Sequence, residues 1–564
     1  MIEVLKNYIN PIFKECGYDY DIRIIKSNRP DLCDYQCDDA FKLAKIYKQN
    51  PMVIGQNVVN KINEQDNFND YFKEVTLVNG FINITLSDRL INNQLSKMLI
   101  NDNFNLPKPE KQETYFLDYG GPNVAKPLHV GHLRTAIIGE SIKRIINFAG
   151  HKTICDVHLG DYGLQIGEVI YGILEDKIDI NDITLDYLNV TYPKMSKRCK
   201  EDENLLKECA RITKELQEGN IEYQKLWKKI MEVSLDDIKR IYNYLDVSFD
   251  LWEGESDSYK TIPTITKELK NKKLLSLSDG ALVIDVKEDD DKKEIPPLLY
   301  QKSNGAYLYG TTDLATLYER VNNYKIDHLI YITDARQALH FKQVFRVANK
   351  WGITDNITLT HIGYGTVNGQ DGKPFKTRNG DAASLSSLLE QIKESFKEIK
   401  ESNKEMSEED LDIITNSIVK FADLQNNWER DYIFDIKKFS EVVGKTGPYV
   451  LYTYLRINKI IKSYNLNINS FNEYIYNEID RNLRLKLLEL PIIINNSLKD
   501  KMPSYIAEYI YDLCWIANTF YQTNHIGSTT DETIKNEWLK LLNLTNNIIK
   551  TLLDLLVIKI PSKM

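Results

Sequence analysis

The first hundred residues combine two hydrophobic periodicities. Apolar side chains recur at helical spacing over residues 39–62, with an interruption at Pro51, which predicts two consecutive helices. Residues 73–87 carry a strand pattern on both sides of Asn79-Gly80, which predicts a β-hairpin with a tight turn. Residues 105–113 are rich in proline and charge and predict a linker. The pattern indicates a separate α+β domain at residues 1–107.

Strands and helices alternate after the linker. Residues 114–120 form a short apolar run that leads into a turn, and residues 130–150 carry apolar side chains at helical spacing. Residues 151–163 repeat the strand and the turn, and the alternation resumes over residues 306–365. The pattern predicts a parallel, doubly wound sheet within residues 108–385, interrupted by a charged helical insertion at about 180–250.

The remainder of the chain has a helical pattern almost throughout. We expect a helical connector at residues 386–440 and an all-α domain at residues 441–564. With 564 residues, the chain is too long for a single hydrophobic core, so several domains are expected. The fold class predicted from the pattern is therefore α/β at the centre, with an α+β domain before it and an all-α domain after it.

Composition narrows the class of protein. No stretch approaches 18 uncharged apolar residues, and the amphipathic start is unlike a signal peptide, so we expect a cytoplasmic protein without a membrane span. The seven cysteines include no CxxC pair, which predicts free thiols and no zinc site. The net charge of −9 argues against non-specific coating of nucleic acid, but it leaves local basic patches open.

Residues 118–135, DYGGPNVAKPLHVGHLRT, carry the strongest chemical signal. A strand ends, a turn with glycine and proline follows, and a helix begins near His129. Helix N-termini bind phosphate through unpaired N–H groups and the helix dipole. His129 and His132 are three residues apart and can face the same side of the first turn. Gly131 allows a bulky ligand against the backbone, and Lys126 adds a positive charge.

Two surface histidines on an ordinary helix would give the same HxGH letters, but the strand–turn–helix context favours a phosphate site. Residues 120–151 resemble the nucleotide-binding signature of arginyl-tRNA synthetases, a family of class I aminoacyl-tRNA synthetases, through the pattern PNxAKxxHxGHLR. The resemblance covers nearly the whole chain, because further family blocks follow in the same order at residues 34–45, 307–317, 332–345, 361–367, 372–380, 422–435, 444–457 and 560–564.

The resemblance implies a fold and a reaction. We expect a Rossmann-like class I catalytic domain, an N-terminal domain that contacts the D-loop of tRNA, and a C-terminal anticodon-binding domain. L-arginine and ATP would give arginyl-adenylate and pyrophosphate, and arginine would then pass to the 3′-terminal adenosine of tRNA(Arg). Members of this family usually need bound tRNA for the first step. ATP would bring Mg²⁺ with it, without a metal site built from protein side chains.

Catalytic and ATP-binding residues follow from the matching positions. The resemblance implies catalytic roles for Lys126, His129, His132 and Lys376. Because charge develops on phosphate oxygens in the transition state, positioned donors and cations should supply most of the catalysis. The remaining contacts to ATP are expected from Ala125, Gly131, His361, Gly363, Val367 and Arg378.

Two stretches compete for the lysine loop that closes over ATP in class I enzymes. Residues 194–197 spell KMSK, but they precede half of the predicted sheet and their downstream flank is charged and helical. Residues 369–381 follow the last predicted strand and contain three glycines, which suits a closing loop. We therefore assign the loop to residues 369–381 and interpret residues 194–197 as a solvated helix start. Lys376 is then the retained lysine, and the resemblance implies that Lys126 compensates for Arg378 at the second position.

The matching positions also imply an arginine pocket. Asn123 and Asp118 would bind the α-amino end of the substrate. Gly120 and Gly121 stand where the family commonly has serine, and Asp118 where it often has glutamate. The guanidinium wants paired carboxylates in fork geometry. It would be bound by residues from later blocks, namely Glu255, Tyr309 and Asp313, with Gln337 nearby. For each acid alone, a surface carboxylate is the ordinary interpretation.

The tRNA contacts would come from both ends of the chain. At the N-terminal hairpin the family positions are Asn79, Phe81 and Asn83, and Phe81 fits equally well as a base-stacking residue or as part of the strand's core. Residues 447–462 mix tyrosines with Arg456 and Lys459, a pattern typical of a nucleic-acid surface. Tyr449, Tyr452 and Leu455 lie at helical spacing and fit a helix core equally well.

Other functions remain open from the sequence. Another HxGH nucleotidyltransferase would make a different adenylate, although the length and the helical C-terminal part argue against it. A cysteine-specific synthetase would require side chains that bind zinc, and the sequence has no such set of ligands. A non-catalytic tRNA-binding paralogue would be expected to have lost site residues, whereas His129, His132, Lys126 and Lys376 are all present. The expected partners are tRNA(Arg), L-arginine and ATP, with the protein acting as a monomer.

Overall fold

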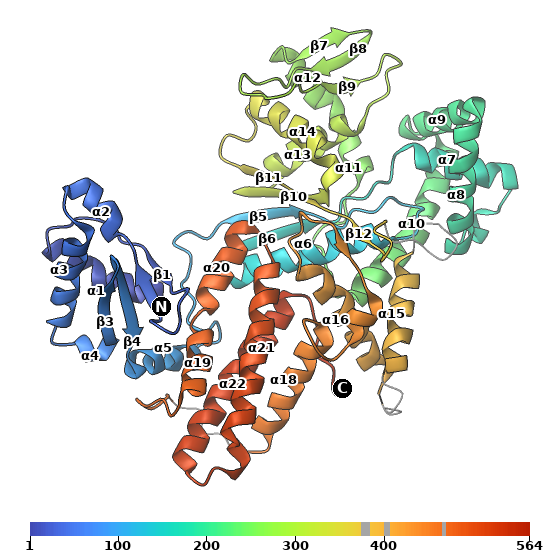
Figure 1. The fold of residues 1–564 in the computed structure, drawn as a ribbon. Coiled ribbons are helices and arrows are strands. Elements are labelled where there is room, and N and C mark those ends of the chain that lie inside the picture. Colours follow the sequence, from blue (N-terminus) through green and yellow to red (C-terminus); the bar gives the residue numbers. More distant parts are fainter. Residues whose placement is uncertain (374–383, 400–405, 465–469) are drawn as a thin grey trace. The chain divides into compact units, whose positions relative to one another are not determined.

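The computed structural model describes residues 1–373, 384–399, 406–464 and 470–564 (Figure 1). The chain folds into two compact units, each built from several segments. We call the first the terminal unit, and it comprises Met1–Pro107, Thr453–Asn495 and Tyr509–Thr551. We call the second the central unit, and it comprises Lys108–Tyr452, Asn496–Glu508 and Leu552–Met564. The two units are described separately.

The N-terminal segment of the terminal unit has the predicted α+β structure. Its four-stranded antiparallel sheet has the order β1-β2-β4-β3, from strands β1 (Ile24–Lys26), β2 (Tyr35–Cys37), β3 (Phe72–Val78) and β4 (Phe81–Leu86). Four helices accompany it, α1 (Ile2–Glu15), α2 (Ala40–Tyr47), α3 (Pro51–Asn63) and α4 (Phe68–Tyr71). The predicted break at Pro51 and hairpin at Asn79-Gly80 are both confirmed. Asn79 and Gly80 have φ values of 50° and 85°, the conformation that a two-residue hairpin turn requires.

Buried charges join this segment to a C-terminal helix inside the terminal unit. Helix α5 (Asp88–Ile100) packs against α19 (Glu478–Leu487). The guanidinium of Arg484 is fully buried, with 2.6 Å from Nε to Asp480 and 2.8 Å from Nη1 to the Asn92 Oδ1 atom. Arg481 forms a second link, 2.6 Å from Asp34. Four long helices complete the C-terminal part of the chain, namely α18 (Gly447–Lys462), α20 (Leu490–Asp500), α21 (Ser504–Asn524) and α22 (Glu532–Leu555), with the short η3 (Ile526–Ser528).

The central unit contains the predicted parallel sheet. Its order is β11-β10-β5-β6, from β5 (Thr114–Asp118), β6 (Lys152–Asp156), β10 (His328–Asp334) and β11 (Thr358–Tyr364). Helix α6 (Val130–Phe148) connects β5 to β6, and α14 (Ala338–Trp351) connects β10 to β11. After β5 the chain forms β6 on one side of it, and the later strands β10 and β11 lie on the other side of β5. Ligands of such sheets bind outside the carboxyl ends of the strands at this reversal point.

Long insertions separate β6 from β10. The predicted charged insertion is helical, with α7 (Leu164–Asp176), η1 (Ile180–Asp182), α8 (Leu185–Glu201), α9 (Glu203–Gln217) and α10 (Ile221–Tyr244). After it come α11 (Glu255–Tyr259), α12 (Ile262–Asn271) and α13 (Tyr309–Asn323). A small antiparallel sheet that the sequence pattern did not predict lies between α12 and α13, formed by β7 (Leu275–Ser278), β8 (Ala281–Ile284) and β9 (Leu298–Gln301).

The helical connector is anchored to α6 through a buried ion pair. Arg134 of α6 is 2.9 Å from Asp423, and both side chains are 1% exposed. Arg134 also donates to the carbonyl of Gly365, beyond the end of β11. The connector itself comprises α15 (Leu385–Ile399), α16 (Glu408–Leu424), α17 (Ile436–Ser440) and the short strand β13 (Tyr432–Ile433). Strand β13 pairs in parallel with β12 (Val367–Asn368), which follows β11. Removing one partner of such a buried pair is strongly destabilising.

Candidate active site

The candidate site lies where β5 and β10 end side by side. Residues 119–129 lead from β5 to α6, and η2 (Ala335–Gln337) follows β10. Thr135 of α6 fixes both strand ends, because its hydroxyl accepts from the Gly120 N–H at 2.9 Å and donates to the Ile332 carbonyl at 2.7 Å. The start of α6 is therefore held at the reversal point of the sheet.

His129 and His132 have their rings fixed by backbone N–H groups. His129 is the N-cap residue of α6, and its Nδ1 accepts from the Gly131 N–H at 3.0 Å. The Nδ1 of His132 accepts from the N–H of His129 at 3.1 Å. The two rings stack with 3.9 Å between their centroids. The predicted helix start and the shared orientation of the two imidazoles are both confirmed.

These contacts determine the protonation of both rings. An Nδ1 atom that accepts a hydrogen bond carries no proton, so the proton of each neutral imidazole is on Nε2. Burial lowers the pKa of His132 to about 3, with further contributions from His129 and Lys126. Partial burial, together with Lys126 and Arg336, also lowers the pKa of His129. Both rings are therefore neutral near pH 7 and present an Nε2–H donor.

Gly131 has a structural role that the sequence did not reveal. A Cβ atom at this position would lie 2.9 Å from Cε1 of the His129 ring, so a side chain would displace the imidazole. Ala125 adopts a left-handed conformation with φ of 64°, and its N–H donates to Ser234 Oγ at 3.2 Å. The next residue, Lys126, places its ammonium 4.6 Å from the ring centre of Tyr192.

The nucleotide-side residues lie on β11 and beyond it. His361 is 2.8 Å from Thr333 Oγ1 through its Nε2 atom, and burial lowers its pKa to about 4, with a contribution from His340. Gly363 approaches Ala335 so closely that a Cβ atom would lie 3.0 Å from the Ala335 Cα atom. Val367 is buried on β12. Lys376 and Arg378 lie outside the described residues. Just after them, Leu385 donates to the Leu128 carbonyl at 2.8 Å, which brings the chain back to the His129 turn.

On the amino-acid side, the structure places Asp118 against a buried arginine. Arg320 is 1% exposed and bridges Asp118 and Asp156, each at 2.6 Å. Asn123 lies beside Gly160, where a Cβ atom would come within 2.1 Å of the Asn123 Oδ1 atom. Gly121 also excludes a side chain, because a Cβ atom would lie 2.5 Å from the carbonyl oxygen of His158.

Glu255, Tyr309 and Asp313 are brought together by the packing of α11 against α13. Burial raises the pKa of Glu255 to about 7, with His158 opposing the shift and Asp313 and Asp161 adding to it. Burial, then Glu255 and Asp313, raise the pKa of Tyr309. Gln337 lies in η2 and is exposed.

Sequence reasoning missed four members of this acidic region. Arg320 and Asp156 form the buried bridge to Asp118, and His340 contacts Asp313 with 2.5 Å between Nε2 and Oδ2. His158 lies near Asp156, with 3.6 Å from its Nδ1 atom to Oδ2. Burial works to lower the pKa of His158, but the close carboxylate of Asp156 and the nearby Asp118 outweigh burial and raise it to about 9. His340 and Gln337 both lie in residues 332–345, one of the stretches that resemble the family. This shared stretch was the feature of the sequence that could have identified His340.

Comparison with known proteins identifies the family. Residues 94–436 match the family described as "tRNA synthetases class I (R), catalytic domain". Residues 1–86 match "Arginyl tRNA synthetase N terminal domain", and residues 450–564 match "DALR anticodon binding domain". The chain is 40% identical over 588 residues to the arginine–tRNA ligase of Alkaliphilus oremlandii, with 100% of both chains covered. The chain belongs to the arginyl-tRNA synthetase family.

Two further comparisons support the assignment of the chain to this family. The chain is 41% identical over 598 residues to the arginine–tRNA ligase of Agathobacter rectalis, with 100% of each chain covered. The crystal structure of arginyl-tRNA synthetase from Plasmodium falciparum is similar at a TM-score of 0.80 and 27% identity, covering 99% of each chain. The family consists of class I, ATP-using arginine–tRNA ligases, and the chain is an enzyme of this class.

The KMSK letters of the synthetase lie in the middle of α8. The interpretation of residues 194–197 as a helix start is wrong, because α8 begins at Leu185, where Thr184 caps it. Met195 is fully buried, and Lys194 is paired with Asp176 at 3.4 Å. The stretch therefore packs within the helical insertion.

The proposed tRNA-binding residues of the synthetase have different surroundings. Phe81 is 37% exposed and meets Phe41 edge-on, whereas Asn83 is buried and accepts from Gln36 at 2.9 Å. Arg456 lies 4.8 Å from the ring centre of Tyr521. Lys459 is exposed and Tyr449 is half-buried. The alternative interpretation of Tyr452 as core is wrong, because it is 44% exposed, and the buried face of α18 includes Val450, Leu451 and Ile457.

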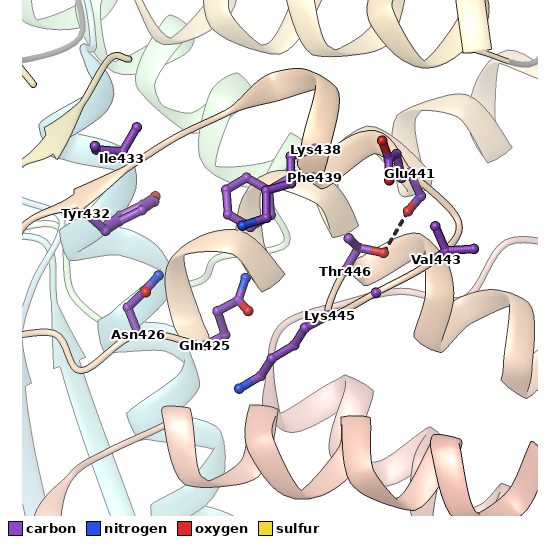
Figure 2. Close-up of a pocket in the computed structure, with 11 residues that line it drawn as sticks. Gln425, Asn426, Tyr432, Ile433, Lys438, Phe439, Glu441, Val443, Lys445 and Thr446 are labelled. Carbon is purple, nitrogen blue, oxygen red and sulfur yellow. Dashed lines mark hydrogen bonds between the residues drawn. The ribbon is translucent and has the colours of Figure 1, made fainter. Parts of the chain in front are cut away.

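A separate cavity of about 490 Å³ lies in the central unit, between the end of α16 and the segment before α18 (Figure 2). Its lining includes the ring of Phe439 and the side chains of Lys438 and Lys445. Lys445 is ion-paired with Glu508, and Glu441 also lines the cavity. This mixture of charges selects no class of ligand, and we assign the cavity no role.

Proposed function

We propose that the synthetase activates L-arginine at the acidic region and binds ATP at the His129 turn. Arginyl-adenylate and pyrophosphate would form there, and arginine would then pass to the 3′-terminal adenosine of tRNA(Arg). The observation that carries this proposal is the fixed pair of Nε2–H donors at the start of α6, at the reversal point of the sheet. Donors held before the reaction stabilise developing phosphate charge without reorganisation.

The proposed binding site for the arginine side chain rests on the acids of α11 and α13. A guanidinium remains protonated in proteins and prefers carboxylates at two sides. Glu255 is the first residue of α11 and Asp313 lies on α13, which packs against it, and Asp313 adds to the raised pKa of Glu255. A cation bound between them would relieve this repulsion and favour the charged form of Glu255. We assign Tyr309 and Gln337 to the same end, and Asn123 to the α-amino end.

Asp118 is assigned an indirect role at the α-amino end. Its Oδ2 atom is committed to Arg320 at 2.6 Å, and Arg320 also binds Asp156. The bridge fixes the carboxylate at the end of β5, next to the turn that contains Asn123. Contact with the substrate ammonium would have to use the other carboxylate oxygen.

The proposed phosphate-binding site combines hydrogen-bond donors with positively charged side chains. His129 and His132 would donate Nε2–H to phosphate oxygens, and Lys126 would supply a positive charge beside them. The proposal also gives Lys376 and Arg378 the role of the closing lysine loop. Mg²⁺ would enter bound to ATP, with phosphate oxygens among its ligands. Ala125, Gly131, His361, Gly363 and Val367 would surround the nucleotide.

The proposal extends to partners and location. The D-loop of tRNA(Arg) would contact Asn79, Phe81 and Asn83. The anticodon arm would contact Tyr449, Arg456 and Lys459. Among the described residues, helices long and apolar enough to cross a bilayer are absent. We further propose that the enzyme works as a monomer in the cytoplasm and that adenylate formation requires bound tRNA.

The proposed function is tested by ATP–pyrophosphate exchange and by charging of tRNA(Arg). We expect exchange with arginine when tRNA is present, much less exchange without tRNA, and transfer of labelled arginine to tRNA. Exchange only with another amino acid would point to a different adenylate. Binding of tRNA without exchange under any condition would identify a non-catalytic paralogue and contradict the proposal.

A further inference from the structure

The carboxylate of Asp313 is already engaged by a histidine. His340 Nε2 lies 2.5 Å from Asp313 Oδ2, and the two side chains are 29% and 21% exposed. Asp313 lies in the first turns of α13, one helical turn after Tyr309, and His340 is the third residue of α14. These two helices pack against each other, so the contact joins two rigid elements. A charge-assisted hydrogen bond between half-buried groups is stronger than a fully exposed pair.

The surroundings of His340 limit its motion. Its ring meets Phe341 edge-on, with 5.3 Å between centroids, and Phe341 in turn stacks on His361 at 4.7 Å. His361 is bonded to Thr333 at 2.8 Å. His340 therefore contacts an acid of the proposed arginine pocket directly and connects to a histidine of the proposed nucleotide side through Phe341. This packing favours a fixed ring over a free surface side chain.

We propose that His340 is a positioning residue for arginine, which holds Oδ2 of Asp313 so that the other carboxylate oxygen faces the substrate guanidinium. The inference rests on the proposed function and adds a residue to that site. An aspartate held at one oxygen offers one acceptor in a fixed direction. The second contact of the forked guanidinium then falls to Glu255, the first residue of α11, which packs against α13.

This arrangement has a consequence for specificity. Two single acceptors on different helices can both meet a planar fork, whereas the compact ammonium of lysine presents its donors at a single point. A loosened Asp313 would swing toward either cation. His340 therefore contributes to the preference for arginine over lysine as well as to arginine affinity.

The test compares His340→Ala with His340→Gln in ATP–pyrophosphate exchange with tRNA present. The glutamine amide retains an N–H donor, whereas alanine removes it. We expect His340→Ala to raise the KM for arginine about 10-fold, and kcat and the KM for ATP to change less than about twofold. His340→Gln should recover most of the loss. Leu339→Ala, at an exposed neighbour on the same helix, is the matched control and should resemble wild type.

A double-variant cycle separates positioning from general packing. If His340 acts through Asp313, then Asp313→Asn combined with His340→Ala should raise the KM for arginine no further than Asp313→Asn alone. Additive effects would overturn the proposal. So would equal damage by alanine and glutamine, an equal rise in the KM for ATP, or an unchanged KM in His340→Ala. Failure of wild type to exchange with arginine would instead reject the proposed function itself.

Discussion

The turn at residues 126–132 and helix α8 at residues 194–197 both spell class I signature letters, but their surroundings differ. His129 and His132 use backbone N–H groups to fix their rings, and each leaves an Nε2–H to donate. Lys194 has its charge neutralised by Asp176, and Met195 is buried in the insertion. A helix start leaves donors without partners, whereas a helix interior satisfies its own backbone. The backbone context, more than the letters, therefore determines which stretch can bind phosphate.

The largest expected effect is at the histidine turn. His132→Ala removes a neutral, fixed donor to phosphate oxygens and should lower kcat for pyrophosphate exchange about 10²–10³-fold. The KM for arginine should change little, because the acidic region is left intact. The measurement is exchange at saturating ATP and arginine, with thermal unfolding as the control for folding. A variant with nearly wild-type kcat would remove the turn from the mechanism.

The next effect concerns the acid held by His340. Asp313→Asn removes the charge that we propose for the substrate guanidinium and should raise the KM for arginine about 10- to 100-fold. The KM for ATP should stay within about threefold, since the nucleotide side uses other residues. Steady-state exchange with each substrate varied in turn measures both. A selective defect in ATP would contradict the assignment.

A smaller effect is expected from pH. Burial raises the pKa of Glu255 to about 7, so its carboxylate is ionised above that pH and protonated below it. Because the substrate guanidinium needs the ionised form, the KM for arginine should rise about 10-fold between pH 8 and pH 6. Glu255→Gln should have a higher KM that no longer depends on pH in this window. Identical pH profiles for the two proteins would exclude Glu255 as the titrating group.

The smallest effect is expected in α8. Lys194→Ala breaks an exposed ion pair with Asp176 and should change kcat, both KM values and Tm only marginally, since such pairs contribute about 0–1 kcal/mol. The same exchange and unfolding measurements apply. A loss of kcat without a loss of Tm would restore the KMSK stretch as a candidate for the lysine loop.

Local features were predictable because they depend on neighbouring residues. The helix break at Pro51, the turn at Asn79-Gly80 and the start of α6 at His129 each follow from short-range chemistry. The start of α8 was misplaced, since Pro193 directly precedes the KMSK letters and proline is better tolerated in the first turn of a helix than in its interior. The small sheet β7–β8–β9 was missed because its strands are four residues each, too short for a clear period.

Contacts between distant parts of the chain were beyond the sequence pattern. Arg320 binds Asp118 across 202 positions, and His340 binds Asp313 across 27. Each contact depends on how β5, α13 and α14 pack, which no local period encodes. The family resemblance identified the candidate residues Asp118 and Asp313. The structure was needed to identify Arg320 and His340 as the side chains that fix their carboxylates.

The most direct test of the account compares Lys126→Ala with Lys197→Ala in pyrophosphate exchange, at matched Tm. Lys126 lies in the turn before His129, and Lys197 lies on the exposed side of α8. We expect kcat to fall at least about 30-fold in Lys126→Ala, through loss of a cation at the phosphates. In Lys197→Ala we expect kcat to change by less than about twofold. Equal losses in the two variants would contradict the central claim that Lys126 of the turn, and not the KMSK stretch of α8, supplies a cation at the phosphates.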